Sequence, residues 1–472
     1  MKKQLILFCL LLVTALGGTA QSINGSWSGT LSFQGMEIPL IFHIQQATDG
    51  SYTTTMDSPK QGAKGLATKQ TTLNGQELLI DASNLGIQYK GLFEPDSNRI
   101  TGTFSQGGAN LPLVLTNGNI PEKREAIKVK RPQDPTSFPY KQEEVSFNST
   151  ATGVTLAGTL TLPEGKVKKV VVLISGSGPQ NRNEELAPFN HRPFLVWSDW
   201  LTRQGIAVLR YDDRGVEKST GNFQLSTTAD FANDAEAAVT FLKSRPELKG
   251  AAIGLLGHSE GGIIAPMVAS RNKDVQFVVM LAGPGVPIPE LMVRQNADQL
   301  RLSGAPDSMV RSSETINRAI YSDIHQLKDL PEKEFATALE KAIITQLTKA
   351  APSADTNVLQ DAAKGIAGPI SSPWYRYFLG IDPATYLSKV KCSVLAINGS
   401  LDSQVSSEPN LAAIRTALQQ AGNKKAKVID LPGLNHLFQQ ASTGSVQEYG
   451  QLEETVNPAA LQLVSDWILT LK

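Results

Sequence analysis

Short runs in which hydrophobic and polar residues alternate dominate the first quarter of the chain. Runs of this kind lie at 40–45, 77–81 and 99–104, and Gly, Asn, Asp and Pro residues separate them. Alternation with a period of two is typical of strands that bury one face, and many short strands with turn residues between them indicate an antiparallel barrel or sandwich. We therefore expect a small all-β domain at 21–117, with Trp27 as one of its core aromatic residues.

The next segment, at 118–142, shows no hydrophobic period. Four prolines stand there among charged residues. This composition favours extended, turn-rich chain over helices or strands, so we expect a linker at 118–142.

After residue 142 the pattern changes to continuous apolar runs that alternate with helical periods. Two alternating strands are expected first, at 143–150 and 154–162. The later runs are too continuously apolar for a half-exposed sheet, which indicates an α/β fold with a doubly wound, mostly parallel sheet. These strands are expected at 169–174, 206–211, 251–256, 275–282, 393–398 and 427–431. The helices between them are expected at 194–203, 229–244, 262–271, 410–421 and 458–471.

A long insertion interrupts this rhythm after the strand at 275–282. It contains helix-like runs at 290–302 and 332–349 and no good strand. An insertion of this length in a compact domain is usually functional, so we expect a helical lid at about 286–385. Its aromatic run WYRYF, at 374–378, is expected either to line the substrate pocket or to form the core of the lid.

The N-terminus has the composition of a secretory signal segment. Lys2 and Lys3 precede an apolar stretch at 5–16 that is too short for a stable membrane anchor, and small residues lead to Ala20. We expect cleavage after Ala20, so that residues 1–20 are removed and the protein is periplasmic or secreted. A helix of the fold is the alternative, but nothing amphipathic runs through the stretch. No later stretch has the ~20 apolar residues of a membrane-spanning helix.

The composition excludes several classes of function. The 472 residues include 44 Lys and Arg against 44 Asp and Glu, and 41% are hydrophobic, as in a folded globular protein. No long basic stripe, zinc-ligand spacing or phosphate-binding Gly-Lys-Ser/Thr loop is present, so we expect no nucleic acid, metal or cofactor as partner. The two cysteines, Cys9 and Cys392, do not form a disulfide framework, because Cys9 lies in the segment expected to be removed.

A Gly-x-Ser-x-Gly pattern occurs within GHSEGG at 257–262, directly after the strand expected at 251–256 and before a plausible helix. In that context a sharp turn lifts the Ser259 hydroxyl above the sheet, and the glycines let neighbouring backbone approach without a Cβ clash. We therefore expect Ser259 to be a nucleophile. A tight strand-to-helix turn with an incidental serine is the alternative.

A serine nucleophile needs a histidine to accept its proton and a carboxylate to orient that histidine. We expect His436 as the base because it follows the last expected strand, where α/β sheets place catalytic groups. Asp402 follows the preceding strand, and the order Ser, Asp, His agrees with that of hydrolases with this turn. Asp382 and Asp430 are the competing acids. The other histidines are in the β-domain, before a helix, beside the serine or in the insertion: His43, His191, His258 and His325.

The transition state of acyl transfer also needs N–H donors for its oxyanion. The backbone N–H of Glu260, directly after the serine, is expected to be one of them. The Gly-rich turn ISGSGP after the strand at 169–174 is expected to supply the other, from Ser177 or, as second choice, Gly178. A phosphate-binding loop is the alternative for this turn, but no Lys-Ser/Thr follows it.

Four segments together resemble the serine hydrolases of the α/β-hydrolase superfamily: GHSEGG, RYDDRG at 210–215, NGSLDSQV at 398–405 and GLNHLF at 433–438. The resemblance spans about 143–472 and is closest to the exported esterase and serine-aminopeptidase-like branch. It implies an α/β-hydrolase fold with Ser259, Asp402 and His436 as the catalytic triad. It also implies a structural turn beside the site, formed by Arg210, Asp212 and Arg214.

The chain departs from the pattern of this branch at a few positions. Ser175-Gly176 stands where the branch often has His-Gly, Glu217 where it has Gly, and Asn181 and Asn183 where it has acids. The triad is unaffected, but substrate contacts around these positions are expected to differ. The β-domain is similar to small barrel-like modules attached to such hydrolases.

These features together indicate an exported serine hydrolase that works through an acyl-enzyme. We expect a carboxylesterase for small-molecule esters with short or medium acyl groups. A serine peptidase or aminopeptidase-like amide hydrolase is the alternative, because the branch contains both activities. From a different class, a binding protein would hold a glycan on its β-domain beside an inert hydrolase, but the intact triad spacing argues against it. The acyl and alcohol groups and the oligomeric state are not predicted.

Overall fold

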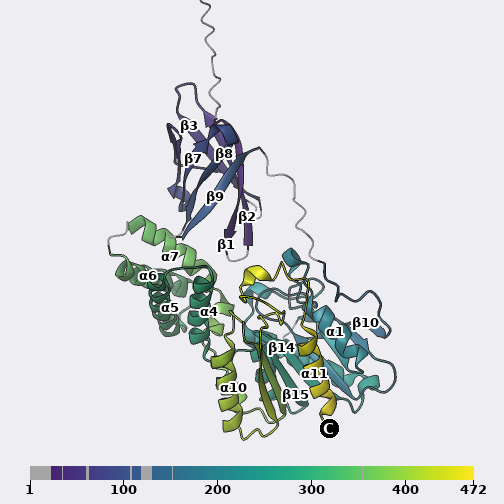
Figure 1. Ribbon diagram of the computed structural model, residues 1–472. Coiled ribbons are helices and arrows are strands. Elements are labelled where there is room, and N and C mark those ends of the chain that lie inside the picture. Colours follow the sequence, from purple (N-terminus) through teal and green to yellow (C-terminus); the bar gives the residue numbers. More distant parts are fainter. Residues whose placement is uncertain are drawn as a thin grey trace, which may run out of the picture. The chain divides into compact units, whose positions relative to one another are not determined.

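The computed structural model describes residues 23–33, 36–59, 63–106, 109–118, 130–150, 153–352 and 356–472 (Figure 1). The chain separates into two compact units, Met1–Lys123 and Arg124–Lys472. The expected signal segment, 1–20, lies outside the described residues.

The N-terminal unit is built of antiparallel strands. In the described part these are β1 (Gly25–Phe33), β2 (Met36–Gln46), β3 (Tyr52–Ser58), β4 (Ala63–Ala67), β5 (Gln70–Asn74), β6 (Glu77–Ala82), β7 (Ile87–Glu94), β8 (Arg99–Gln106) and β9 (Ala109–Asn117). Because β2 pairs with both β1 and β3, the sheet closes into a barrel, one of the two architectures expected. Trp27 is fully buried inside it, and its indole N–H donates to the carbonyl oxygen of Ile23 at 2.6 Å. The core position predicted for Trp27 is therefore confirmed.

The second unit is built on an eight-stranded sheet with the order β10-β11-β13-β12-β14-β15-β16-β17. The strands are β10 (Lys141–Asn148), β11 (Thr155–Leu162), β12 (Lys169–Ile174), β13 (Ala207–Tyr211), β14 (Ala252–His258), β15 (Val275–Leu281), β16 (Ser393–Gly399) and β17 (Ala426–Leu431). The first two run antiparallel and the others are parallel to one another. Every strand expected from the continuous apolar runs is present.

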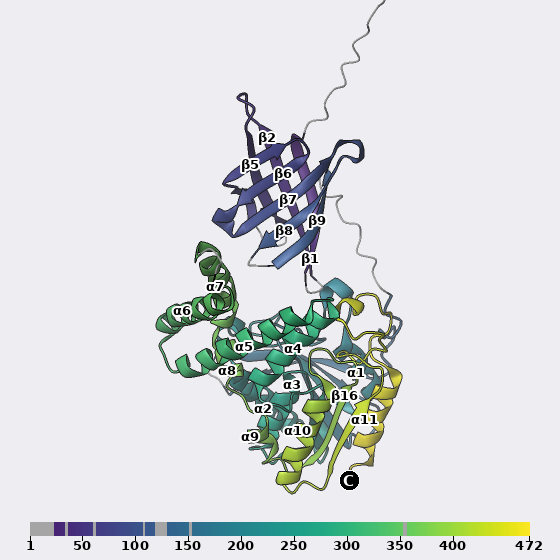
Figure 2. The same cartoon turned by 60° about the vertical axis from the view of Figure 1, so that its left-hand side comes forward.

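Helices cover both faces of this sheet, which explains why its inner strands β12, β14 and β15 are almost continuously apolar. Helices α1 (Pro193–Arg203) and α11 (Pro458–Thr470) lie together on one face, whereas α2 (Thr228–Ser244), α3 (Gly261–Ala269) and α10 (Ser407–Gln420) lie on the other (Figure 2). Successive residues of β12 show the consequence. Val171 packs in the core under α1 and α11, and Val172 packs in the core on the opposite face.

The insertion between β15 and β16 is helical, as expected. In its described part the helices are α4 (Ile288–Leu302), α5 (Asp307–Leu327), α6 (Glu332–Ala350), α7 (Thr356–Ile370), α8 (Pro373–Phe378) and α9 (Ala384–Leu387). Helices α4 to α7 lie side by side in both views (Figures 1 and 2). On α6, the buried residues Phe335, Leu339 and Ile343 recur every four positions, the spacing of one helix face. These side chains are part of one hydrophobic cluster that also contains the residues under α2, α3 and α10, so the insertion is joined to the core of the second unit.

Part of the expected linker is bound to the second unit. We call residues 130–140 the strap. Arg131 is buried, and its guanidinium donates to the backbone carbonyls of Phe189, Tyr449, Leu452 and Glu454. Because these partners are carbonyl groups far away in the sequence, the strap needs no hydrophobic period. The expectation of a linker over all of 118–142 is therefore wrong for residues 130–142, which belong to the second unit.

Among the described residues, no helix is long and apolar enough to cross a membrane.

Candidate active site

Ser259 occupies a strained turn between β14 and α3. Its φ is 54°, a left-handed value that is uncommon for a residue with a side chain, and its backbone N–H donates to the carbonyl of Leu281 at 2.9 Å. The flanking glycines are required by close backbone contact. A Cβ at Gly257 would lie 1.9 Å from the carbonyl oxygen of Gly261, and one at Gly261 would lie 2.2 Å from that of Ile174. The turn therefore holds Ser259 in one conformation with its side chain partly exposed.

The structure brings His436 and Asp402 together after the last two strands of the sheet. His436 Nδ1 donates to Asp402 Oδ2 at 2.7 Å, and both side chains are almost completely buried. The second oxygen of Asp402 accepts the backbone N–H groups of Gln404 and Val405, each at 2.8 Å. These bonds fix the carboxylate and leave Nε2 of His436 for another partner.

The two competing acids have other partners. Asp430 accepts a hydrogen bond from the hydroxyl of Ser407, and Asp382 accepts the backbone N–H of Ala384 at the start of α9. The choice of Asp402 made from the sequence therefore agrees with the geometry.

His258 connects the turn of Ser259 to the loop of His436. Its Nε2 donates to the carbonyl oxygen of His436 at 3.0 Å, its Nδ1 donates to Glu184 at 2.9 Å, and its ring centre lies 4.8 Å from that of His436. When Glu184 is ionised, both partners only accept, and a proton on each nitrogen of His258 satisfies both bonds. Burial alone would lower the pKa of His258, but the Glu184 carboxylate raises it above its ordinary value. His258 and Glu184 thus form a buried ion pair, which the sequence analysis missed.

The Gly-rich loop after β12 lies against this turn. A Cβ at Gly176 would lie 3.1 Å from the Cβ of Ser259. The backbone N–H of Gly176 donates to Glu184 Oε1 at 2.7 Å, and the hydroxyl of Ser177 donates to Glu260 Oε2 at 2.7 Å. In contrast, the backbone N–H groups of Ser177 and Glu260 donate to no group in the described part of the chain. The two N–H groups predicted from the sequence are therefore available to a ligand.

The acids of the RYDDRG segment hold the loop in place. Asp213 accepts the hydroxyl of Ser175 and the backbone N–H of Gln180, each at 3.0 Å. Burial raises the pKa of Asp213 well above its ordinary value. Asp212 pairs with the guanidinium of Arg182 at 2.7 Å. This turn is structural, as the resemblance implied.

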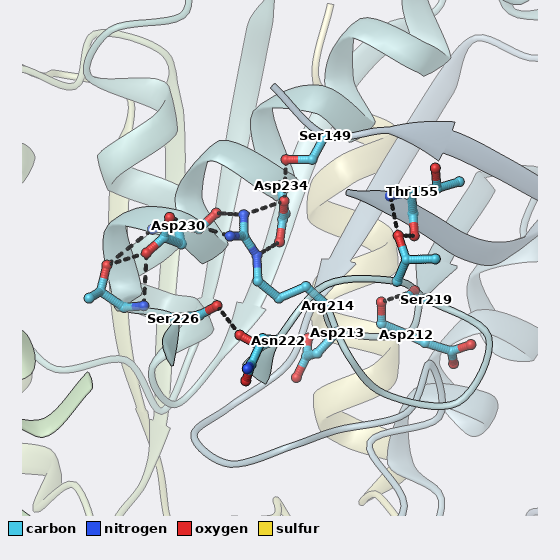
Figure 3. A network of polar contacts seen from close by, with 12 residues as sticks. Ser149, Thr155, Asp212, Asp213, Arg214, Ser219, Asn222, Ser226, Asp230 and Asp234 are labelled. Carbon is cyan, nitrogen blue, oxygen red and sulfur yellow. Dashed lines mark hydrogen bonds and ion pairs between the residues drawn. The ribbon is translucent and has the colours of Figure 1, made fainter. Parts of the chain in front are cut away.

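Arg214 anchors the same turn to α2 (Figure 3). Its guanidinium donates to both carboxylate oxygens of Asp234, at 2.7 and 2.8 Å, and to the backbone carbonyl of Asp230. Ser149 donates to Asp234 from the opposite side. Bidentate, buried pairing of this kind fixes geometry more firmly than a single surface ion pair does.

One of the departures from the branch pattern has a structural partner, and another has an unusual backbone conformation. Asn183 accepts a hydrogen bond from Arg210, whose pKa is lowered by burial to about 10. Glu217 adopts a left-handed φ of 46° at the position where the branch has glycine. Asn183 thus contributes a contact to the RYDDRG turn, whereas Glu217 is exposed.

Other chemistry has little support among the described residues. No group of three or more His, Cys, Asp and Glu residues in them is placed to hold a metal. Burial raises the pKa of the Cys392 thiol to about 11, so this cysteine is a poor nucleophile at neutral pH. A cavity of about 750 Å³ reaches Asp402 from the side of α4 and α10, but Ser259 is not among its lining residues.

Comparisons with known proteins point to one superfamily. Residues 192–362 match the family described as serine aminopeptidase, S33. Esterase EstD of Thermotoga maritima is 28% identical over 309 residues, which are 65% of this chain and 61% of that protein. Acyl-coenzyme A thioesterase 1 of Mus musculus is 29% identical over 125 residues, 25% of this chain and 28% of that protein. The solved structure of a Pyrococcus furiosus esterase covers 70% of this chain and 91% of its own, with 16% identity and a TM-score of 0.41.

This chain thus spans less than two thirds of the length of the curated relatives it matches. The match lies on the unit that carries the doubly wound sheet and the Gly-x-Ser-x-Gly turn. The second unit has the α/β-hydrolase fold, and the chain is similar to the family of serine-aminopeptidase-like hydrolases and to the esterase EstD.

Proposed function

We propose that this enzyme is a carboxylic ester hydrolase that acts on small esters with short or medium acyl groups. The observation that carries the proposal is the buried pair of His436 and Asp402 beside the strained turn of Ser259. A serine becomes nucleophilic only when an oriented histidine accepts its proton, and this arrangement supplies the orientation.

In the proposed reaction, Ser259 Oγ attacks the ester carbonyl carbon while His436 Nε2 takes the hydroxyl proton. The N–H groups of Ser177 and Glu260 bind the oxyanion of the tetrahedral intermediate. The intermediate then collapses, the carbon–oxygen bond to the alcohol breaks, and His436 gives its proton to the departing alcohol. Water attacks the acyl-enzyme with His436 as base again, and the acid leaves. Asp402 holds the histidine in the required tautomer throughout.

The acids beside Ser259 favour an ester over a peptide amine as substrate. An aminopeptidase needs an unpaired carboxylate that binds the substrate's ammonium group. The charge of Glu184 is balanced by His258, and the carboxylate of Glu260 accepts hydrogen bonds from the protein. EstD, a relative by sequence, is described as an esterase, which also supports ester hydrolysis.

A direct comparison of substrates tests this proposal. p-Nitrophenyl esters of two to eight acyl carbons and aminoacyl anilides would be offered to the same preparation, with Ser259→Ala as the control. We expect turnover of the esters, no turnover by the control, and at most slow hydrolysis of the anilides. Faster hydrolysis of the anilides than of every ester would show that the enzyme is a peptidase.

We also propose that the protein is exported, because residues 1–20 have the composition of a signal segment. N-terminal sequencing of the protein from fractionated cells tests this. We expect a chain that begins at Gln21 in the periplasm or medium. A chain that retains residues 1–20 in the cytoplasm would contradict export.

A further inference from the structure

The carboxylate of Glu260, which follows Ser259 in the chain, is buried and accepts three hydrogen bonds. Glu260 is only 2% exposed. Its Oε2 accepts the hydroxyl of Ser177 at 2.7 Å, and its Oε1 accepts the hydroxyl of Thr228 at 2.7 Å and the indole N–H of Trp374 at 2.9 Å. A role for the Glu260 backbone N–H alone does not account for this side chain.

The three donors belong to three separate parts of the second unit. Ser177 lies in the loop after β12, and its backbone N–H donates to no group in the part of the chain that the structure describes. Thr228 is the first residue of α2, and Trp374 is the second residue of the lid helix α8. We call the loop after β12 the oxyanion loop. The Glu260 carboxylate therefore joins the lid and the oxyanion loop to the turn of Ser259.

Trp374 has a second contact, which lies within α8 itself. Its ring stacks on Phe378, with ring centres 4.8 Å apart, and Phe378 is buried. The sequence analysis left open whether these aromatic residues line the pocket or form the lid core. Phe378 is in the core, whereas Trp374 is half-buried and donates its one N–H to Glu260.

Because the Glu260 carboxylate is buried, the loss of any one of its three hydrogen bonds is expected to be costly. Burial raises the pKa of Glu260, and its three hydrogen bonds act in the opposite direction by favouring the charged form. A buried carboxylate that loses a donor is left with an unsatisfied oxygen, which is costly in a low-dielectric interior. A displacement of α8 would therefore also disturb the bond that holds Ser177.

We propose that Glu260 is a positioning residue whose carboxylate fastens the lid helix α8 to the oxyanion loop, so that the lid sets the position of the Ser177 N–H. This inference rests on the proposed hydrolase function. It makes Trp374 a residue that acts on the rate for every ester, not only on the choice of acyl chain. A tryptophan that only lined the pocket would change the preference for chain length instead.

Four variants of the full chain test the inference. Trp374→Phe keeps the ring on Phe378 and removes the N–H. Glu260→Ala removes the acceptor, and Glu260→Gln retains an oxygen toward Trp374. Tyr375→Phe is the matched control, because it removes a hydroxyl bonded to Tyr321 in the same lid and leaves Glu260 untouched. For each protein, kcat and KM on p-nitrophenyl acetate and octanoate are measured, together with the rate of tryptic cleavage within the lid.

If Glu260 fastens α8 to the oxyanion loop, kcat of the Glu260 and Trp374 variants falls on both esters by a similar factor while KM changes little. We expect a loss of about 10-fold or more in Glu260→Ala, which stays below the 10²–10³-fold effect of deleting an oxyanion donor. The loss should be about 3- to 10-fold in Trp374→Phe and smaller in Glu260→Gln. The lid of Glu260→Ala and Trp374→Phe should be cleaved several-fold faster than that of the parent, since its attachment is weaker. Tyr375→Phe should match the parent in both measurements.

Three results would overturn the inference. One is a kcat of Trp374→Phe within twofold of the parent on acetate. Another is a loss confined to octanoate, and the third is an equal loss in Tyr375→Phe, which would reflect general lid packing. If the parent itself hydrolysed no ester, the proposed function would fail. In that case the tryptic cleavage of the folded variants would still decide whether Glu260 holds the lid.

Discussion

Each unit of this chain holds a histidine that is hydrogen-bonded to an aspartate, but the two settings differ. In the barrel, Ser26 Oγ lies 2.8 Å from His43 Nδ1, and His43 Nε2 lies 3.0 Å from Asp57. In the second unit the aspartate is on the other ring nitrogen, because His436 Nδ1 faces Asp402 at 2.7 Å. The aspartate is thus bonded to Nε2 of His43 but to Nδ1 of His436, which leaves Nε2 of His436 for the proposed proton transfer from Ser259.

The backbone conformation at Ser26 differs from that at Ser259 more clearly than the neighbouring side chains do. Ser26 and His43 are direct cross-strand partners inside β1 and β2. Ser259 stands in a left-handed turn before a helix, next to N–H groups that donate to no other group among the described residues. His43 is 34% exposed at its side chain, whereas His436 is 4% exposed. From this comparison we expect that contact between a serine, a histidine and an aspartate is insufficient, and that activation of the serine also needs a strained turn, oxyanion donors and exclusion of water.

The largest effect is expected when each serine is removed. Ser259→Ala should lower kcat for ester hydrolysis on the order of 10⁶-fold, because the hydroxyl that forms the acyl-enzyme is lost. Ser26→Ala should leave kcat within twofold of the parent. Steady-state assays with p-nitrophenyl acetate measure both. Residual turnover by Ser259→Ala within tenfold of the parent would remove Ser259 from the mechanism.

The next largest difference in kcat is expected between substitutions of the two aspartates, Asp402 and Asp57. Asp402→Asn should lower kcat on the order of 10⁴-fold, since an amide in that place favours the wrong tautomer of His436. Asp57→Asn, the matched change in the barrel, should leave hydrolysis unchanged. The same assay applies, with circular dichroism as a check that both variants fold. Equal activity of Asp402→Asn and the parent would mean that another acid orients His436.

A smaller effect is expected from Asp213, which holds the loop beside Ser259 and makes the free energy of unfolding depend on pH. The pKa of Asp213 is raised in the folded protein, so between its unfolded and folded values the native state retains a proton that the unfolded chain has lost. The parent is therefore destabilised as pH rises through this range, by about 1.4 kcal/mol per pH unit. Asp213→Asn removes this dependence, so its free energy of unfolding relative to the parent should increase with pH. Urea denaturation at pH 5 and pH 8 measures the difference, and a decrease with pH would contradict the assignment.

The smallest effect on activity is expected from removal of the barrel. A chain that begins at residue 130 keeps the strap and every residue of the proposed mechanism, so it should hydrolyse small esters within about twofold of the parent. A chain that begins at residue 141 loses the carbonyl contacts of Arg131. Its melting temperature should be lower by about 5 °C. Loss of activity in the first chain while it remains folded would show that the barrel takes part in hydrolysis.

The sequence predicted the elements of the second unit well because buried strands and amphipathic helices leave a periodic pattern. It also indicated Ser259, Asp402 and His436, since each follows a strand at the carboxyl edge of the sheet. Glu184 left no such signal. It lies in a loop, with a left-handed φ of 51°, and its partner His258 is 74 residues away in the chain.

Contacts between side chains and backbone carbonyl groups also leave no pattern in the sequence. The strap binds through Arg131 to carbonyls about 320 residues further on, and any residue type supplies a carbonyl. Likewise, the alternating runs of the barrel domain fit a barrel or a sandwich. Only the pairing of β2 with β3 decides between them. Periodicity therefore predicts elements, whereas long-range polar contacts have to be seen in the structure.

We infer that the strained turn and the oxyanion N–H groups, rather than the presence of a serine, a histidine and an aspartate, make Ser259 reactive. Labelling of the full chain with a fluorophosphonate, followed by digestion and mass spectrometry, tests it most directly, because only an activated serine reacts. The account predicts covalent modification of the peptide that contains Ser259 and an unmodified peptide at Ser26. A label on Ser26, or no label on Ser259 in a folded protein, would contradict it.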